Sequence, residues 1–196
     1  MARIDGGPGN DNRHGTAGAD VFYMRGGDDV AAGWAGNDVM NGGDGDDRLN
    51  GNEGSDTLDG GAGRDTLNGG DGADRILGGY GGDELWGGAG LDVFEWNTIR
   101  AQGNSYVDTM MDFNHGDRID LQGIDANWNR DGDQAFRFIG RSEFSGQAGE
   151  LRYSNLVING VAYTTDIYAD VDGDRQPDLY LAINGGLSLY ASDFIL

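Results

Sequence analysis

A period of nine residues, kept without insertion over residues 6–95, constrains the fold of this chain more than any other feature. All ten units have Gly at position 4 and Asp at position 6, and nine have Gly at position 1 and an apolar residue at position 8. Residues 42–50, GGDGDDRLN, form a representative unit. Such short-period self-similarity is typical of solenoids, in which each unit is buried only by its neighbours. The sequence therefore predicts a stacked all-β structure here.

Each position of the unit has a physical interpretation. Glycine at positions 1, 2 and 4 permits positive φ and a tight turn without Cβ atoms in the way. The last three residues are expected to form a short strand whose central side chain, at position 8, points inward. Two units then complete one coil, which places Asp29 one coil above Asp11. The aspartates at position 6 consequently form two files, one along each edge of the stack.

The two files of aspartates predict a cation. Carboxylates stacked at roughly 5 Å repel one another unless positive charge lies between them. Carboxylates together with turn carbonyls make an all-oxygen site, which suits Ca²⁺ better than Zn²⁺ or Cu²⁺. The members are Asp11, Asp29, Asp47, Asp65 and Asp83 in file one, and Asp20, Asp38, Asp56, Asp74 and Asp92 in file two.

The first units depart from the pattern. Met24 replaces Gly at position 1, and position 2 is occupied by Thr16, Arg25 and Trp34. Position 8 is weakened by Arg13 and Ala31. We therefore expect fraying of the first coils and secure pairing from about residue 33 onward.

Composition alone allows other interpretations. The formal net charge of -21 and the 38 glycines fit a disordered linker, and they make nucleic acid or an anionic membrane surface a poor partner. The strict phase of the apolar position disfavours disorder. An ice-binding solenoid requires a regular outward file of Thr or Asn, and position 5 is irregular. There is no Cys, which excludes disulfides and thiolate metal sites.

These units match GGxGxDxUx and so resemble the repeats-in-toxin (RTX) family. The resemblance implies a right-handed parallel β-roll in which each Ca²⁺ lies between two turns on one edge. The lower turn then supplies its Asp and the carbonyls of positions 2 and 4, and the upper turn supplies its Asp and the carbonyls of positions 1 and 3. The clearest site joins Gly43, Gly45 and Asp47 to Gly60, Ala62 and Asp65, and its neighbour joins Asn52, Gly54 and Asp56 to Gly69, Asp71 and Asp74. The other carbonyl ligands so implied are Gly9, Gly18, Gly27, Gly36, Gly61, Gly63, Gly70, Gly72, Gly33, Gly42, Gly51, Gly78, Gly87, Asp44, Glu53, Tyr80 and Ala89.

From residue 96 to 196 the nine-residue register is lost, and short alternating segments such as 106–113 predict a small antiparallel β-sandwich-like domain. DTMMDFNHGDRIDL at 108–121, GDQAFRFIG at 132–140 and SGQAGELRYS at 145–154 resemble the C-terminal domain of serralysin-type metalloproteases. The last residues, Asp193 to Leu196, resemble the uncleaved export signal of type I-secreted proteins. The resemblance implies secretion from a Gram-negative bacterium through an ABC exporter complex.

A second metal loop is a weaker candidate. Asp170, Asp172, Asp174 and Asp178 alternate as in a calcium loop, but the EF-hand spacing is not met, and an acidic hairpin turn explains them as well. Asp131 and Asp133 around Gly132 form a weaker pattern still.

No catalytic motif is present. Neither His14 nor His115 belongs to an HExxH sequence, and there is no G-x-S-x-G elbow. We therefore expect a non-enzymatic, monomeric module that folds on binding about six to eight extracellular calcium ions, with no membrane insertion. The alternatives are the C-terminal part of a larger secreted enzyme, such as a zinc metalloprotease or a polysaccharide-active enzyme, and a free-standing adhesin. The last would bind a glycan or cell-surface ligand through aromatics among Tyr23, Trp34, Tyr80, Trp86, Trp96 and Trp128.

Overall fold

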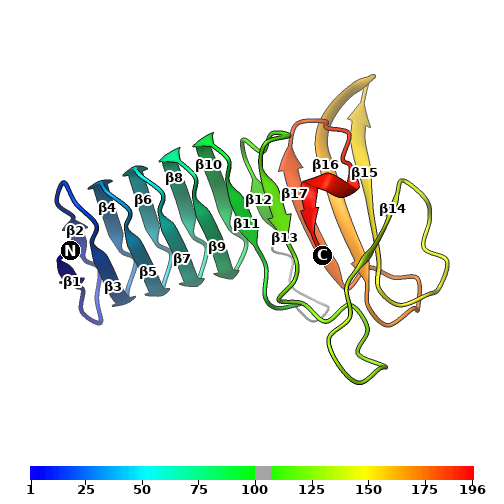
Figure 1. The fold of residues 1–196 in the computed structure, drawn as a ribbon, viewed down its shortest axis with the longest axis horizontal. Coiled ribbons are helices and arrows are strands. Elements are labelled where there is room, and N and C mark those ends of the chain that lie inside the picture. Colours follow the sequence, from blue (N-terminus) through cyan, green and yellow to red (C-terminus); the bar gives the residue numbers. More distant parts are fainter. Residues whose placement is uncertain (100–106) are drawn as a thin grey trace.

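The computed structural model describes residues 1–99 and 107–196, and these residues form two extended β-sheets that face each other along a rod (Figure 1). One sheet has the order β1-β3-β5-β7-β9-β11-β13-β18 and the other β14-β15-β16-β17-β12-β10-β8-β6-β4-β2. The rod strands are β1 Arg3–Asp5, β2 Asn12–His14, β3 Val21–Gly26, β4 Val30–Ala35, β5 Val39–Asp44, β6 Arg48–Glu53, β7 Thr57–Ala62, β8 Thr66–Gly72, β9 Arg75–Tyr80, β10 Glu84–Gly90 and β11 Val93–Glu95. They are followed by β12 Asp108–Met110, β13 Arg118–Asp120, β14 Arg137–Gly140, β15 Glu150–Ile158, β16 Val161–Asp170, β17 Leu179–Asn184, the short 3₁₀ helix η1 Ala191–Asp193 and β18 Phe194–Ile195.

The coil of two units is confirmed by the strand register. Leu49 pairs with Leu67 and Leu67 with Leu85, all in parallel strands of one sheet. Most rod strands are longer than the three residues expected, because pairing continues through positions 1 to 3 of the next unit, as Gly43 with Gly61 shows. The prediction of a three-residue strand was wrong, because the positive-φ residue at position 2 remains paired in the ladder.

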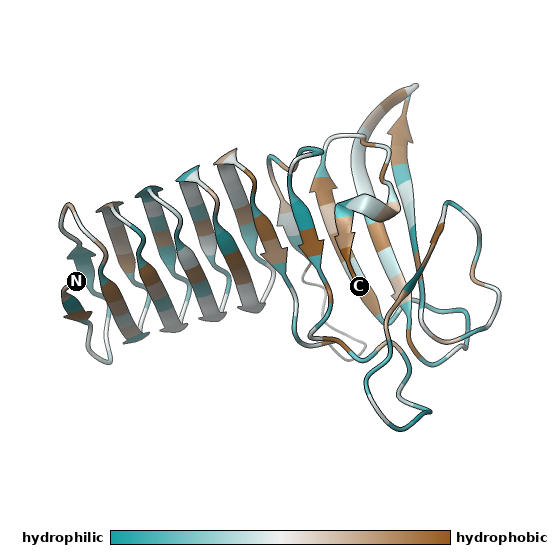
Figure 2. Ribbon diagram, viewed as in Figure 1, coloured by the Kyte–Doolittle hydropathy of each residue, from teal (hydrophilic) through white to brown (hydrophobic). Residues whose placement is uncertain are grey.

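The core of the rod is a double column of apolar side chains. Position 8 supplies one buried residue per strand, from Phe22 to Phe94, and Figure 2 shows hydrophobic bands recurring on successive strands of the rod. Parallel strands stack like on like, so each apolar side chain packs against its equivalents one coil away. The rod is therefore only as wide as two inward-pointing side chains.

Roll-like pairing does not stop at residue 95. β12 pairs with β10 in parallel and β13 pairs with β11 in parallel, so that Met110 and Ile119 extend the two buried columns. Neither sheet ends at the expected boundary between residues 95 and 96. The roll therefore extends beyond the ten units expected to form it. The expected strand at 106–113 begins outside the described residues, and its described part contains β12.

Only three of the C-terminal strands are antiparallel to one another, since β14 pairs with β15 in parallel, and all four continue a sheet of the roll. β15 pairs with β16 and β16 with β17 in antiparallel fashion, while β17 pairs in parallel with β12. A β-sandwich separate from the roll is not seen in the described residues. β18 pairs with β13 and ends the other sheet, with Phe194 beside Ile119.

The irregular first units keep the turn geometry. Arg25 and Trp34 adopt positive φ values of 82° and 78°, where most units have Gly, and Asn52 adopts 72°. Met24, at the position usually taken by Gly, is fully buried at the N-terminal end of the core. β3 and β4 accordingly have six residues each, and the three-residue strands at this end of the roll are confined to β1 and β2. None of the helical segments described is long and apolar enough to cross a membrane.

Candidate metal sites along the two aspartate files

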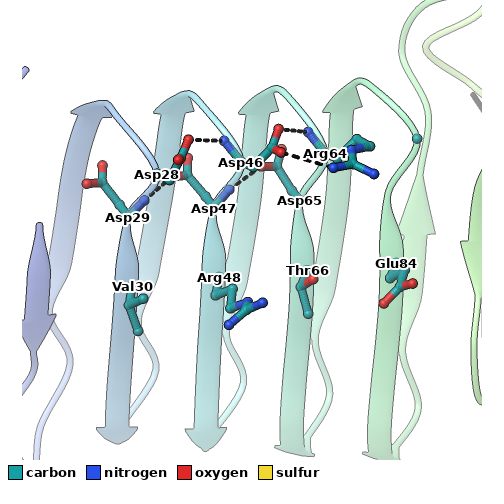
Figure 3. Close-up of a pocket in the computed structure, with 11 residues that line it drawn as sticks. Asp28, Asp29, Val30, Asp46, Asp47, Arg48, Arg64, Asp65, Thr66 and Glu84 are labelled. Carbon is teal, nitrogen blue, oxygen red and sulfur yellow. Dashed lines mark hydrogen bonds and ion pairs between the residues drawn. The ribbon is translucent and has the colours of Figure 1, made fainter. Parts of the chain in front are cut away.

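The predicted files form, and their backbone amides link one coil to the next. The Asp47 backbone N–H donates to Oδ1 of Asp65 at 2.8 Å, and the Asp29 N–H donates to Oδ1 of Asp47 at 2.7 Å. The same bond recurs in file two, where the Asp56 N–H donates to Oδ1 of Asp74 at 2.8 Å. Figure 3 shows Asp29, Asp47 and Asp65 in a row at the start of successive strands. Each Oδ1 therefore satisfies the amide of the coil before it.

The other carboxylate oxygen in these files has no protein partner. The Oδ2 atoms are buried and make no hydrogen bond in Asp29, Asp38, Asp47, Asp56, Asp65, Asp74 and Asp92. Leaving one buried polar atom unpaired costs on the order of 1–3 kcal/mol, and more for a charged group. Seven such atoms, in phase with the repeat, favour a ligand that carries positive charge.

The space beside each Oδ2 atom is lined by oxygens. A Cβ atom added to Gly42 would lie 2.3 Å from Oδ2 of Asp47 and 2.5 Å from the carbonyl oxygen of Gly60. Position 1 is thus glycine because a side chain would fill the space between a carboxylate and the carbonyl of the next coil. The donor set is one that Ca²⁺ prefers.

Two further carbonyls approach the same turn pair from below. The Gly43 oxygen would lie 2.1 Å from a Cβ on Gly61, and the Gly45 oxygen 2.0 Å from one on Gly63. The Ala62 carbonyl accepts the Gly45 N–H at 2.7 Å and keeps a second lone pair. The residues predicted for the clearest site are therefore brought together by the fold, and they fit a calcium ion.

Burial raises the pKa values of the interior aspartates. The pKa of Asp65 is raised to about 7, first by burial and then by the charges of Asp83 and Asp47. Burial likewise raises the pKa values of Asp47 and Asp74 to about 6. The folded chain without a cation thus disfavours the charged form of these groups, whereas a divalent cation would favour it.

A groove of about 500 Å³ follows the outside of file one (Figure 3). In it the position-5 residues form a second ladder: the Asp46 N–H donates to Oδ1 of Asp28 at 3.1 Å, and the Arg64 N–H donates to Oδ1 of Asp46 at 2.8 Å. These carboxylates are exposed and their backbone contacts hold successive turns in register. The position-5 carboxylates thus lie outside file one, and their oxygens are not among the buried Oδ2 atoms that lack a partner.

Sequence analysis missed the last member of each file. Asp108 Oδ1 accepts the Asp83 N–H at 3.0 Å, and Asp117 Oδ1 accepts the Asp92 N–H at 3.1 Å. Each is separated from its predecessor by 25 residues instead of 18, so one insertion of seven residues (25 minus 18) after β11 displaces both. Beyond it the spacing of nine returns, and Asp117-Arg118-Ile119 repeats the pattern of Asp74-Arg75-Ile76. That triplet was the signal that could have identified them.

One further carboxylate belongs to this end. Asp112 lies in the turn above β10 and accepts the N–H groups of Gly87 and Gly88, both at 2.9 Å. It therefore stands close to the turn that ends with Asp92, whose Oδ2 has no partner.

The second candidate loop is closed by its own backbone. Asp170, Asp172 and Asp174 offer oxygens within 4.8 Å of one another. However, both oxygens of Asp170 accept backbone N–H groups, from Gly173 at 2.7 Å and Arg175 at 3.0 Å. Asp178 accepts the Val171 N–H at 2.8 Å. The structure thus explains this loop as an acidic turn without invoking an ion.

Two other residues singled out in the sequence have structural roles. His14 stacks on Trp34 at 5.8 Å between ring centroids, on the surface of the roll. Trp96 is buried and donates its indole N–H to Oδ2 of Asp108 at 2.8 Å, so it cannot contribute to an exposed aromatic platform.

Comparison with known proteins agrees with this architecture. The chain belongs to the family described as Peptidase M10 serralysin C terminal, whose model matches residues 6–196. This family is of the RTX β-roll type, its members generally bind calcium and are typically secreted by type I systems, and the domain itself is non-catalytic.

Among solved structures, the chain is similar to the solution structure of the AlgE6R3 subunit from the Azotobacter vinelandii mannuronan C5-epimerase. The identity is 20%, the match covers 97% of this chain and 80% of that chain, and the TM-score is 0.43. A comparison with curated proteins gives no significant match.

Proposed function

We propose that this chain is a calcium-dependent folding module of a secreted protein: the roll stays unfolded where calcium is scarce and folds where calcium is abundant. The observation that supports this most directly is the set of seven buried Oδ2 atoms without a partner. They lie in strict phase, beside carbonyl oxygens that face them from the next coil. Metal binding and folding are then one event, because each site takes its ligands from two coils.

The expected ligands of each site come from two turns that lie one coil apart. The lower turn contributes Oδ2 of its aspartate, and the upper turn contributes the carbonyl of its first glycine, as Asp47 and Gly60 illustrate. We propose about six to eight such ions, with the site between Asp92 and Asp117 added to those expected from the repeats alone. Asp112 would supply an additional carboxylate there.

The free energy involved is large enough to control folding. Extracellular calcium modules bind with Kd values on the order of 10⁻⁴–10⁻³ M. At ten times Kd, one independent site stabilises the folded state by about 1.4 kcal/mol. Six to eight sites then contribute roughly 8–11 kcal/mol, which is comparable with the whole stability of a domain.

Secretion through a type I exporter is the cellular setting we propose for this switch. Asp193 and Phe194 of the signal-like sequence are 2% and 7% exposed, because β18 pairs with β13 and η1 precedes it. An exporter could recognise these residues only before the roll folds. Release into a calcium-rich medium would then fold the monomer and bury the signal.

The alternative in which this module serves a larger secreted enzyme is supported by the family match, since the family's description places it at the C terminus of a peptidase. Under this proposal the roll would act as the part of that enzyme that is exported unfolded and folds outside.

The test is a calcium titration followed by far-UV circular dichroism. Wild-type protein in excess chelator should lack most of its β signal and regain it cooperatively as calcium is added. Asp65→Asn should raise the calcium midpoint several-fold, because Asp65 serves the sites above and below it. Asp46→Asn is the matched control, with the same charge change at an exposed position-5 site. A full β signal in chelator, or equal midpoints for the two variants, would contradict the proposal.

A further inference from the structure

The first aspartate of file one differs from Asp29, Asp47 and Asp65 in having both oxygens satisfied by the protein. Oδ2 of Asp11 accepts the Gly7 N–H at 2.6 Å, and Oδ1 lies 2.6 Å from Nη2 of Arg13. Arg13 is held in place by two backbone carbonyls, those of Asp5 at 3.2 Å and Asn12 at 3.1 Å. The guanidinium of Arg13 thus occupies position 8, where the other nine units have an apolar side chain.

The first aspartate of file two is saturated by different donors. Oδ1 of Asp20 accepts the Ala2 N–H at 2.6 Å. Oδ2 accepts both the Thr16 N–H at 2.6 Å and the Thr16 hydroxyl at 2.8 Å. These hydrogen bonds, with that from Ala2 first, lower the pKa of Asp20, whereas burial raises that of Asp38 one coil further on.

Two of the donors in these turns, Arg13 and Thr16, stand at positions where the sequence departs from the repeat, whereas the Gly7 and Ala2 donors are backbone N–H groups. Arg13 replaces the apolar residue of position 8, and Thr16 replaces the glycine of position 2. Each brings a hydrogen-bond donor or a positive charge to an aspartate that the interior of the roll would leave for a cation. In the interior, the corresponding Oδ2 atoms of Asp47 and Asp56 have no partner.

We propose that the first coil is a calcium-independent cap, in which Arg13 and Thr16 do for Asp11 and Asp20 what calcium does for the later aspartates. This inference rests on the proposed calcium function, and it states where along the roll the calcium sites begin. An oxygen that already accepts a charged or short hydrogen bond would have to lose that bond to coordinate an ion. Neither turn pair that starts at Asp11 or Asp20 therefore takes up calcium.

The opposite end of each file is closed in the same manner. Oδ2 of Asp108 accepts the Trp96 indole N–H at 2.8 Å, and Oδ2 of Asp117 accepts the Asn114 N–H at 2.9 Å and its side-chain amide at 3.0 Å. Both files therefore begin and end on protein donors, and the unpartnered oxygens lie between them.

The experiment compares early and interior aspartates of the same file. Asp11→Asn and Asp20→Asn, with Asp47→Asn and Asp56→Asn as matched interior variants, are titrated with calcium by isothermal calorimetry, and folding is monitored by circular dichroism. The first pair should fold with the wild-type number of ions and a calcium midpoint changed less than twofold. The second pair should lose at least one ion and show a midpoint raised several-fold.

Loss of an ion, or failure to fold at saturating calcium, in Asp11→Asn or Asp20→Asn would overturn the cap. If the wild type binds no calcium, the proposed function itself fails, so the two failures are distinguishable.

Discussion

The interior coils of the roll and the antiparallel strands β15–β17 are parts of one sheet, yet they are stabilised by different means. Each interior rod strand buries one apolar side chain, such as Leu67, and each turn buries one carboxylate, such as Asp65. By contrast, β16 alone buries Ile167 and Ala169, which pack in a core with aromatic and aliphatic neighbours. The roll thus combines a narrow apolar column with buried charge, while the C-terminal strands have a conventional core.

The difference indicates which region should depend on a ligand for its stability. Apolar burial contributes about 1.5–3 kcal/mol for each fully buried aliphatic side chain, whereas ordering each residue costs about 1–2 kcal/mol in backbone entropy alone. One apolar side chain per nine residues cannot offset that cost. We therefore expect the roll to depend on cations at its turns more strongly than the C-terminal strands do.

Removal of calcium should have the largest effect on stability, and it should affect the roll more than the C-terminal strands. In excess chelator, amide hydrogen exchange over β5–β10 should lose nearly all protection, while β15–β17 retains part of its protection. Peptide-resolved hydrogen exchange with and without calcium measures this. Equal loss in both regions would show that they unfold as one unit and that the comparison fails.

A side chain added at a turn glycine should have the next largest effect on calcium-induced folding. Gly61 has φ of 103°, and a Cβ there would lie 2.1 Å from the Gly43 carbonyl, so Gly61→Ala should abolish cooperative calcium-induced folding or raise its midpoint at least tenfold. The control is Gly9→Ala, because a Cβ on Gly9 has nothing within 4 Å. Circular dichroism during calcium titration gives both midpoints, and similar values for the two variants would contradict the turn geometry.

Core truncations sharpen the comparison further. Leu67→Ala and Ile167→Ala each remove a side chain that is 0% exposed and should each cost about 2–5 kcal/mol. The loss at Leu67 should be recovered in part by raising calcium, because binding and roll folding are linked. The loss at Ile167 should depend less on calcium. Urea unfolding at two calcium concentrations tests this, and the same calcium dependence in both would count against separate means of stabilisation.

Acid should partly replace calcium in the roll. Because the folded-state pKa values of Asp65 and Asp47 are raised to about 7 and about 6, the folded chain without metal binds more protons than the unfolded chain between these values and the ordinary Asp pKa. The penalty for burying these charges is fully present above pH 7 and is relieved as the pH falls. In chelator, β signal should therefore increase from pH 8 to pH 5. A decrease over this range would show that the interior carboxylates are not penalised by burial.

Ion pairs on the outer face should have the smallest effect on the calcium midpoint of folding. Arg64 lies 3.4 Å from Asp46, and both side chains are more than half exposed, so Arg64→Ala should leave the calcium midpoint within experimental error. The Arg64 N–H remains to donate to Asp46. A midpoint shifted severalfold in a calcium titration would show that the outer ladder takes part in ion binding.

The phase of the repeats made the files predictable, because a strict period translates directly into stacking. Asp47 and Asp65 could be placed one coil apart from spacing alone, whereas their carbonyl neighbours came from the resemblance to the RTX family. Asp108 and Asp117 could not, because an insertion of seven residues shifts the phase once for both files. The continuation of the sheets into β17 and β18 depends on contacts between residues far apart in sequence, which no local pattern encodes. Saturation of Asp11 depends on where the Arg13 side chain lies, and the sequence showed this residue only as a defect of the core.

Because two units make one coil, the rod can become longer or shorter by whole coils without a change in its cross-section. Because β6 and β8 are equivalent by translation, as are β5 and β7, deletion of residues 42–59 would join coils that already match and shorten the rod by one step. Deletion of a single unit would instead move every later strand to the opposite sheet and exchange the two files. Because protein hydrogen-bond donors saturate the aspartates at both ends, the roll can gain or lose whole interior coils while its end coils stay the same. The number of candidate ion sites would then change in evolution with the number of coils.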